Sequence, residues 1–121
     1  RGQMTVLEEH IAHHKHVHEL YQELLGDIVK DNPGKDYESN FWLTTVNFKN
    51  NIDILAFCHK LNAAGIEARQ LWKPMHLQPV YKDAPAYTNG VSENLFKTGI
   101  CLPSGPWVTD DDVRLIVETM K

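Results

Sequence analysis

The chain has 121 residues, of which 42% are hydrophobic and 23% charged, and this composition is typical of one soluble globular domain with a sizeable core. Its formal net charge of −4 argues against general nucleic-acid binding, which usually needs a surplus of basic residues. No apolar run approaches the ~20 residues of a membrane-spanning helix, and nothing near the start resembles a signal peptide. Cys58 and Cys101 form no CxxC pair, so they are interpreted as reduced buried thiols, with a single disulfide as the alternative.

Apolar residues at helical spacing predict a long first helix over roughly residues 3–26, which ends near Gly26. The expected stripe consists of Met4, Leu7, Ile11, Tyr21 and Leu25, widened by Val17, Leu24 and Ile28. The polar segment 30–39 contains Asn-Pro-Gly and is expected to be a loop. Aromatic and β-branched residues then predict a strand over residues 40–48.

A second helix is predicted over residues 50–64. Asn50 is the expected N-cap, Asp53 lies three residues further on, and Gly65 stands where a helix-ending glycine belongs. A second strand is predicted over residues 66–71.

The last third of the chain predicts a short helix over residues 91–97 and a third strand over residues 99–102, which Pro103 ends. Thr109 and Asp112 then form a capping-box pattern, and three consecutive acids favour the start of a helix there. The apolar face of this last helix is Val113, Ile116, Val117 and Met120.

This order of elements predicts an α+β fold in two layers. Helices are expected to pack on one face of a small antiparallel or mixed sheet of about three strands. The sheet residues expected in the core are Phe41, Leu43, Ile66, Ile100 and Leu102.

Five histidines occur in the nine residues 10–18 of "HIAHHKHVHEL". His14 and His18 are four residues apart, a spacing that can hold zinc. Both fall on the predicted buried face, no cysteine is near in sequence, and no HExxH pattern occurs, so packing or interface histidines are favoured over a metal site. A His-rich metal-binding domain is retained as the weaker alternative. Ser104 lacks a GxSxG context, so no hydrolase nucleophile is predicted there.

The segment "RQLWKPMHLQPVY", residues 69–81, fits neither a helix nor a strand. Its spacing favours a surface loop in which Trp72 and Tyr81 cover the core. The alternative is a binding loop, stiffened by prolines, that holds polar and aromatic groups at one rim. Arginine and lysine suit phosphate or carboxylate, tryptophan suits a flat ring, and histidine and glutamine suit sugar hydroxyls or a cofactor. The rim residues are Arg69, Trp72, Lys73, His76 and Gln78.

The segments "GIEARQLWKPMHLQPVY" and "GICLPSGPWVTDDDVRLIVETMK" resemble the C-terminal part of sugar aminotransferases of the DegT/DnrJ/StrS kind. These are pyridoxal-phosphate enzymes of the aspartate aminotransferase superfamily. The opening "RGQMTVLEEHIAHHKHVHELYQELL" resembles the long helix that crosses from their large domain, and "SNFWLTTV" resembles the strand that follows it. The resemblance covers nearly the whole chain, and it implies that residues 1–121 are the C-terminal small domain of such an enzyme.

The resemblance also implies a function for the longer protein. We expect a cytoplasmic homodimer that aminates a nucleotide-linked keto-sugar for surface polysaccharide or glycan biosynthesis, with an amino acid as amino donor. Members of the family carry the Schiff-base lysine and the main contacts to pyridoxal phosphate in an N-terminal large domain. The chain opens with RGQM rather than with that domain, and none of its lysines lies in a segment like the lysine motif. We therefore expect a fragment with no catalytic residue of its own, inactive by itself.

Within this framework the resemblance assigns substrate contacts to the rim residues. Arg69 and Lys73 are candidates for the anionic parts of the amino donor or nucleotide sugar, and His76 for a place near cofactor or sugar. Trp72 is a candidate for lining or for packing, and Gln78 completes the set. A stand-alone small-ligand-binding module that uses the same loop is the alternative from another class.

Overall fold

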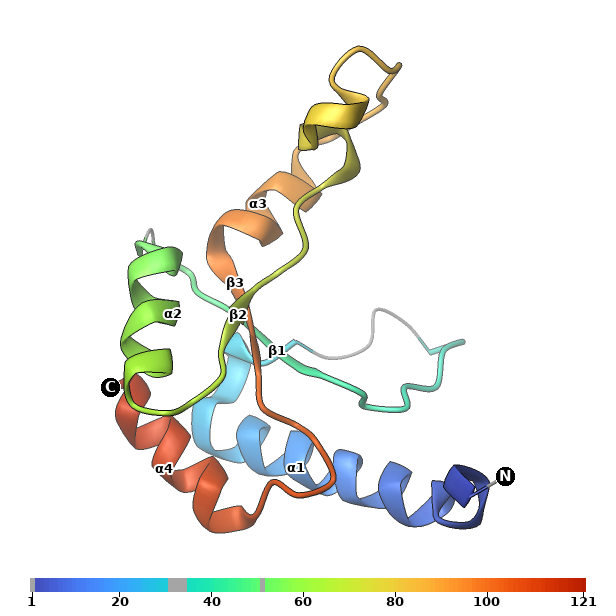
Figure 1. Ribbon diagram of the computed structural model, residues 1–121, viewed down its shortest axis with the longest axis vertical. Coiled ribbons are helices and arrows are strands. Elements are labelled where there is room, and N and C mark those ends of the chain that lie inside the picture. The colour runs from blue at the N-terminus through green and yellow to red at the C-terminus, as the bar shows by residue number, and fades with distance from the viewer. Residues whose placement is uncertain (1, 31–34, 51) are drawn as a thin grey trace.

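A three-stranded antiparallel sheet organises the residues that the computed structural model describes, which are 2–30, 35–50 and 52–121 (Figure 1). Its central strand is β3 (Gly99–Leu102), which pairs with β1 (Thr44–Asn47) on one side and with β2 (Arg69–Gln70) on the other. All four residues of β3 are buried. The predicted α+β fold with a small antiparallel sheet is confirmed.

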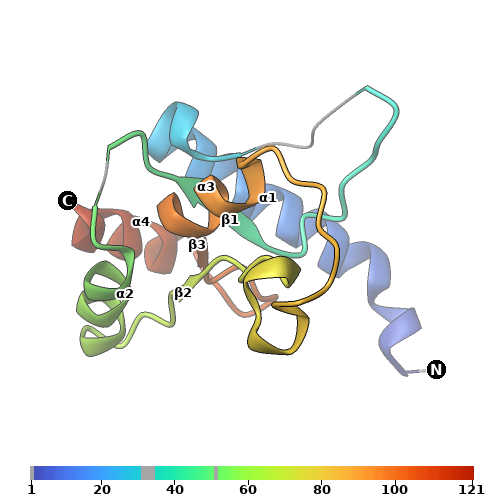
Figure 2. The ribbon, with the colours of Figure 1, turned by 90° about the horizontal axis from the view of Figure 1, so that it is seen from above.

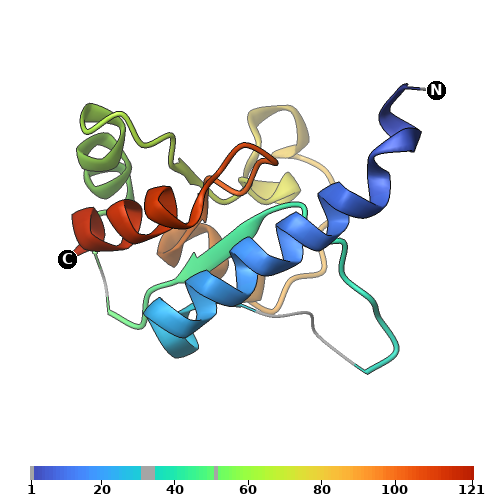
Figure 3. The same ribbon diagram turned by 90° about the horizontal axis from the view of Figure 1, so that it is seen from below.

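Three helices pack against one face of this sheet: α1 (Leu7–Leu25), α2 (Ile54–Ala63) and α4 (Asp110–Met120). Val46 and Ile100 are register partners, so their side chains share a face, and both belong to the same buried cluster as residues of these helices. Figure 1 shows α1 and α4 below the strands, and Figure 3, seen from that side, shows both helices in front of the sheet. The two helices are in contact with each other. Among the described residues, no helix is long and apolar enough to cross a membrane.

Helix α3 (Val91–Thr98) lies outside this helical layer. It runs directly into β3 and projects from the body together with residues 73–90, which we call the arm (Figures 1 and 2). The arm contains the 3-10 turns Met75–Leu77 and Pro79–Tyr81. The side chain of Gln70 ties α3 to β2, because its Nε2 donates to the Phe96 carbonyl at 2.7 Å.

The strand predicted over residues 40–48 is shorter than expected. Phe41 has a φ of 52°, and the preceding side chains form local bonds with the backbone: Ser39 accepts from the Phe41 N–H, and Asn40 from the Trp42 N–H. Such local hydrogen bonds compete with a strand ladder, so β1 begins only at Thr44. Phe41 and Leu43 are consequently half-buried rather than core residues, whereas Ile66, Ile100 and Leu102 are buried as predicted.

The first helix buries less of its predicted stripe than expected. Met4 is 70% exposed and precedes α1 in a 3-10 turn, and Leu7 is exposed as well, because this end of the helix extends beyond the sheet (Figure 3). The buried residues of α1 are Val17, His18, Leu20 and Tyr21.

The second helix begins later than predicted, because Asp53 rather than Asn50 is its N-cap and accepts from the Ala56 N–H at 3.0 Å. The predicted strand 66–71 reduces to Arg69–Gln70. The Thr109–Asp112 capping box of α4 is confirmed, with both reciprocal bonds present.

Ser104 connects the sheet to the turn that follows it. Its hydroxyl accepts from the Thr44 N–H at 3.0 Å and donates to the Leu102 carbonyl at 3.1 Å, so one buried side chain links β1 to the end of β3. The Tyr21 hydroxyl donates to the neighbouring Pro103 carbonyl at 3.0 Å, which holds the same turn against α1.

We predict that Ser104→Ala lowers the free energy of unfolding by about 1–3 kcal/mol, because a buried backbone N–H loses this partner. Urea unfolding measures the change. Ser92→Ala, at an exposed position of α3, is the matched control and should stay within about 0.5 kcal/mol of the unaltered protein. Equal effects of the two substitutions would contradict the assigned role of Ser104.

Candidate functional site

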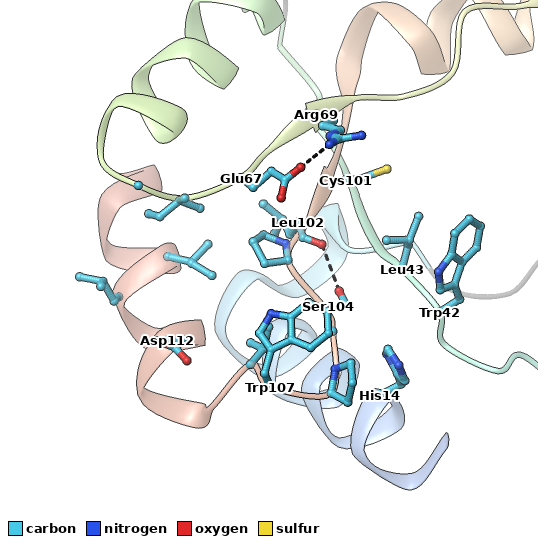
Figure 4. Close-up of a pocket in the computed structure, with 18 of the residues that line it drawn as sticks. His14, Trp42, Leu43, Glu67, Arg69, Cys101, Leu102, Ser104, Trp107 and Asp112 are labelled. Carbon is cyan, nitrogen blue, oxygen red and sulfur yellow. Dashed lines mark hydrogen bonds and ion pairs between the residues drawn. The ribbon is translucent and has the colours of Figure 1, made fainter. Parts of the chain in front are cut away.

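A pocket of about 990 Å³ lies beside β3. Figure 4 shows three segments around it: the chain entering β1, the segment that leads into β2, and the connection from β3 to α4. Trp42 and Leu43 come from the first, Glu67 and Arg69 from the second, and Trp107 from the third. The pocket therefore depends on the sheet, because β3 brings together segments that are far apart in sequence.

All three tryptophans of the chain line this pocket and all are largely exposed: Trp42 and Trp72 at 65% each and Trp107 at 80%. The rings of Trp42 and Trp72 are in contact, with centroids 6.3 Å apart. Exposed tryptophans gathered around one concavity are typical of a surface that meets a ligand or another protein body.

Trp107 lies over the turn because residue 105 is a glycine. A Cβ at Gly105 would stand 2.7 Å from Cζ2 of the Trp107 ring, so any larger residue would displace the indole. The Val108 N–H donates to the Gly105 carbonyl at 3.0 Å and closes this turn. Trp42 and Trp107 were not predicted as site residues. The signal available in the sequence was that Trp42 stands near the start of the predicted strand 40–48 and Trp107 stands two residues before the predicted cap Thr109.

Arg69 is the cation of the pocket wall. It projects from β2, and its Nη2 pairs with the Glu67 carboxylate two residues earlier. Both side chains are well exposed, and an exposed ion pair contributes little to stability. Arg69 can therefore exchange Glu67 for the anionic group of a ligand at small cost. Arg69 was predicted as a rim residue from its segment, whereas Glu67 was not.

His14 enters the same pocket from α1 (Figure 4). Burial lowers the pKa of His14, the neighbouring His13 lowers it further, and the Ser104 backbone opposes the change. The buried Nδ1 of His14 has no hydrogen-bond partner among the described residues. The ring is accordingly held neutral near neutral pH.

The histidine cluster divides by burial much as its helical spacing predicted. His18 is buried and His14 half-buried, whereas His16 is exposed and bonds to Asp110 of α4 at 2.7 Å. Within the part of the chain that the structure describes, no group of three or more His, Cys, Asp or Glu side chains is placed to hold a metal ion.

The five predicted rim residues fall into two groups. Arg69 and Trp72 line the pocket, whereas Lys73, His76 and Gln78 lie in the arm. Gln78 supports the arm itself, because its Nε2 donates to the Lys73 carbonyl at 3.2 Å. His76 contacts Glu93 of α3, a residue that was not predicted to belong to the site.

Trp72 and the arm residue Tyr81 do not cover the core, because both are exposed. The interpretation of residues 69–81 as a loop that covers the core is therefore wrong for these two aromatic side chains.

The side chains present do not fit the covalent attachment of pyridoxal phosphate. Such an attachment needs a lysine amine in a sheltered site. All nine lysines of the chain lie within the described residues, each is exposed, and none lines the pocket.

Comparison with known proteins places the chain in a class. It superposes on the sugar aminotransferase CalS13 from Micromonospora echinospora with a TM-score of 0.76 and 25% identity, over 94% of this chain and 31% of that one. In sequence it is 36% identical to EpsN from Bacillus subtilis, assigned as a pyridoxal phosphate-dependent aminotransferase, over 98% of this chain and 32% of EpsN. It is 23% identical to GDP-perosamine synthase from Caulobacter vibrioides, over 98% of this chain and 34% of that enzyme.

All 121 residues match the DegT/DnrJ/EryC1/StrS aminotransferase family. The chain belongs to this family, and it spans about a third of the length of the curated relatives that it matches.

The environment of His14 predicts a pH dependence of stability. A histidine whose pKa is lowered by folding is neutral in both states well above its ordinary value of 6.5, and there it does not affect stability. As the pH falls through and below that value, the unfolded chain binds the proton more readily than the folded one, so the folded state loses stability. The urea midpoint should therefore drop between about pH 7.5 and about pH 5.5, and drop less in His14→Gln. His59→Gln, at an exposed position of α2, is the control and should keep the full drop. Equal drops in both variants would contradict the assignment.

The exposed lysines predict that the chain by itself captures no pyridoxal phosphate at a specific residue. After borohydride reduction, mass spectrometry should find only scattered, substoichiometric labelling, because every amine is hydrated. Saturable labelling of one lysine at one equivalent per chain would contradict this expectation.

Proposed function

We propose that this chain is the C-terminal small domain of a pyridoxal-phosphate-dependent aminotransferase that acts on a nucleotide-linked keto-sugar. The observation that carries the proposal is the match of all 121 residues to one aminotransferase family. The names of two relatives support the finer statement: CalS13 is a sugar aminotransferase, and GDP-perosamine synthase makes a nucleotide-linked amino sugar by its name. We include in this proposal a role in surface polysaccharide or glycan biosynthesis in the cytoplasm.

On this proposal the chain supplies one wall of the active site. Arg69 binds a phosphate or carboxylate of the substrates, because its ionic partner among the described residues is an exposed neighbour, Glu67, which a ligand can replace. Trp42 and Trp72 offer ring faces to the sugar or its base. Lys73 and His76, which lie further along in the arm, extend the polar surface beyond the pocket.

On this proposal the cofactor and its lysine belong to a larger N-terminal domain. The curated relatives are about three times as long as this chain, which is long enough for such a domain. When bound, pyridoxal phosphate supplies the electron sink of transamination. The role left to this chain is to bind and orient substrates and to exclude water.

The arm supports an interface with other protein bodies. Residues 79–90 are all exposed, and among them Val80 and Tyr87 are 78% and 100% exposed. Apolar side chains with this much solvent exposure are typical of surfaces that another domain or subunit covers. We propose that the large domain and the second subunit of a homodimer cover the arm and the pocket.

We predict that Arg69→Ala, in the protein that contains this chain together with its large domain, lowers kcat/KM for amination of a nucleotide-linked keto-sugar about ten- to hundredfold. The reason is the loss of one charge-assisted contact, worth about 1.5–3 kcal/mol. Coupled measurement of amino-donor consumption and chromatography of the amino-sugar product report the rate.

The matched control is Arg114→Ala, which removes the same side chain from an exposed position of α4. It should leave kcat/KM unchanged. If Arg69→Ala is as active as Arg114→Ala, Arg69 is not a substrate contact. If the unaltered protein aminates no nucleotide-linked keto-sugar, the proposed function itself is wrong.

A further inference from the structure

A second polar pair lies away from the pocket, between the arm and α3. The Nε2 of His76 is 2.7 Å from Oε1 of Glu93, although the two residues are 17 positions apart. Each side chain is only 22% exposed, whereas the equally short pair of His16 and Asp110 is more than half exposed on both sides. The His76–Glu93 pair is thus the more sheltered of the two, and water competes with it less.

The chemistry of Glu93 fixes which nitrogen of His76 carries a hydrogen. Hydrogen bonding to its own backbone N–H lowers the pKa of Glu93, and the bond with His76 and the charge of Lys97 lower it further, against a smaller effect of burial. Glu93 is therefore ionised near neutral pH and can only accept hydrogen bonds. The hydrogen between the two residues belongs to Nε2 of His76, so Nδ1 is the ring nitrogen left for another group.

The two residues differ in how firmly the backbone holds them. Glu93 stands in the first turn of α3, which is tied to β2 through Gln70 and to Asn47 of β1 through the Thr98 hydroxyl at 3.3 Å. His76 stands in the 3-10 turn Met75–Leu77, behind the buried Pro74. A side chain on the anchored helix thus holds the ring of a side chain on the arm.

The second carboxylate oxygen of Glu93 argues that the His76–Glu93 pair does more than join the arm to α3. Oε2 is buried and has no hydrogen-bond partner among the described residues. A buried unpaired oxygen is destabilising, and a glutamine could join the two segments without burying a charge. What the carboxylate provides and an amide does not is a group that can only accept, and that therefore requires a hydrogen on Nε2 of the imidazole.

We propose that Glu93 is a positioning residue for His76: it holds the ring with its hydrogen on Nε2 and leaves Nδ1 to accept a hydrogen bond from a hydroxyl of the nucleotide-linked sugar. This inference rests on the proposed function for the identity of the ligand. The hydrogen on Nε2 and the orientation of the ring follow from the His76–Glu93 contact alone. An acceptor at this position selects sugars that present a hydroxyl to it and disfavours deoxy analogues, which leave Nδ1 unpaired.

The first test reads the imidazole directly in the protein that contains this chain and its large domain. Two-bond ¹H–¹⁵N correlation spectra with ¹⁵N-labelled histidine, assigned by the loss of one ring in His76→Ala, distinguish a hydrogen on Nε2 from one on Nδ1. We expect the Nε2–H form for His76 in the unaltered protein and a mixture of both forms in Glu93→Gln, since an amide can accept or donate. Glu118→Gln, at an exposed position of α4, is the matched control and should leave the spectrum unchanged.

The second test is a double-mutant cycle on kcat/KM for a nucleotide-linked keto-sugar. Glu93→Ala and His76→Ala should each lower kcat/KM about tenfold, and Glu93→Ala should cost nothing further in the His76→Ala background, because it acts through that ring. A loss of full size in both backgrounds overturns the proposal.

The two tests separate this inference from the proposed function. An Nδ1–H form of His76 in the unaltered protein overturns the positioning role whatever the activity. Glu93 variants that lower the melting temperature but leave both the spectrum and kcat/KM unchanged reduce the pair to a structural link. If His76→Ala is fully active while the spectra behave as expected, the assignment of His76 to substrate binding is wrong, and the proposed acceptor role for Nδ1 is wrong with it.

Discussion

The rest of the structure depends on the burial of β3 between two neighbouring strands. Its first residue, Gly99, has no space for a side chain, because a Cβ there would lie 2.3 Å from Cδ1 of Leu71 and 2.7 Å from the Leu95 carbonyl oxygen. Helix α3 therefore enters the sheet directly, with no loop between them, and this sets the direction of the arm. At the other end, Ser104 fixes the turn that leads past the pocket into α4. One short strand thus fixes both the pocket and the arm.

The apolar side chains of the chain are divided between a buried core and two solvent-exposed surfaces, the pocket and the tip of the arm. Helices α1, α2 and α4 cover one face of the sheet and bury its core. The pocket tryptophans and the tip of the arm remain open, even though aromatic side chains left in water forgo a large stabilisation. This distribution agrees with a domain that has two kinds of surface to bury, one against substrate and one against other protein bodies.

The parts of the fold with local signals were predictable from sequence. Residues 99–102 stand between a helix and a proline, and the capping box of α4 is a pattern of four consecutive residues, so both elements were placed correctly. The strand over residues 40–48 was predicted too long, because aromatic residues suit a strand and a pocket wall equally well. The positive φ of Phe41, which separates these two uses, has no sequence signal when the residue is not glycine.

The candidate site was predictable only in part, because several of its residues meet only in the folded structure. Arg69 and Trp72 stood out because they share one unusual segment with prolines. Trp107 joins them only through the pairing of β2 with β3, and Glu93 joins His76 only through the packing of the arm on α3. Contacts between segments tens of residues apart depend on tertiary structure, and no local pattern reports them.

We propose that this chain forms the substrate-facing wall of a sugar aminotransferase. Hydrogen–deuterium exchange of the intact protein, with and without a nucleotide-linked amino-sugar product, tests it most directly. The account predicts slower exchange in the pocket segments 41–43, 69–73 and 104–107, and unchanged exchange in α2, which lies in the helical layer. Protection confined to other parts of the protein, with these three segments exchanging at the same rate in both states, would contradict the account.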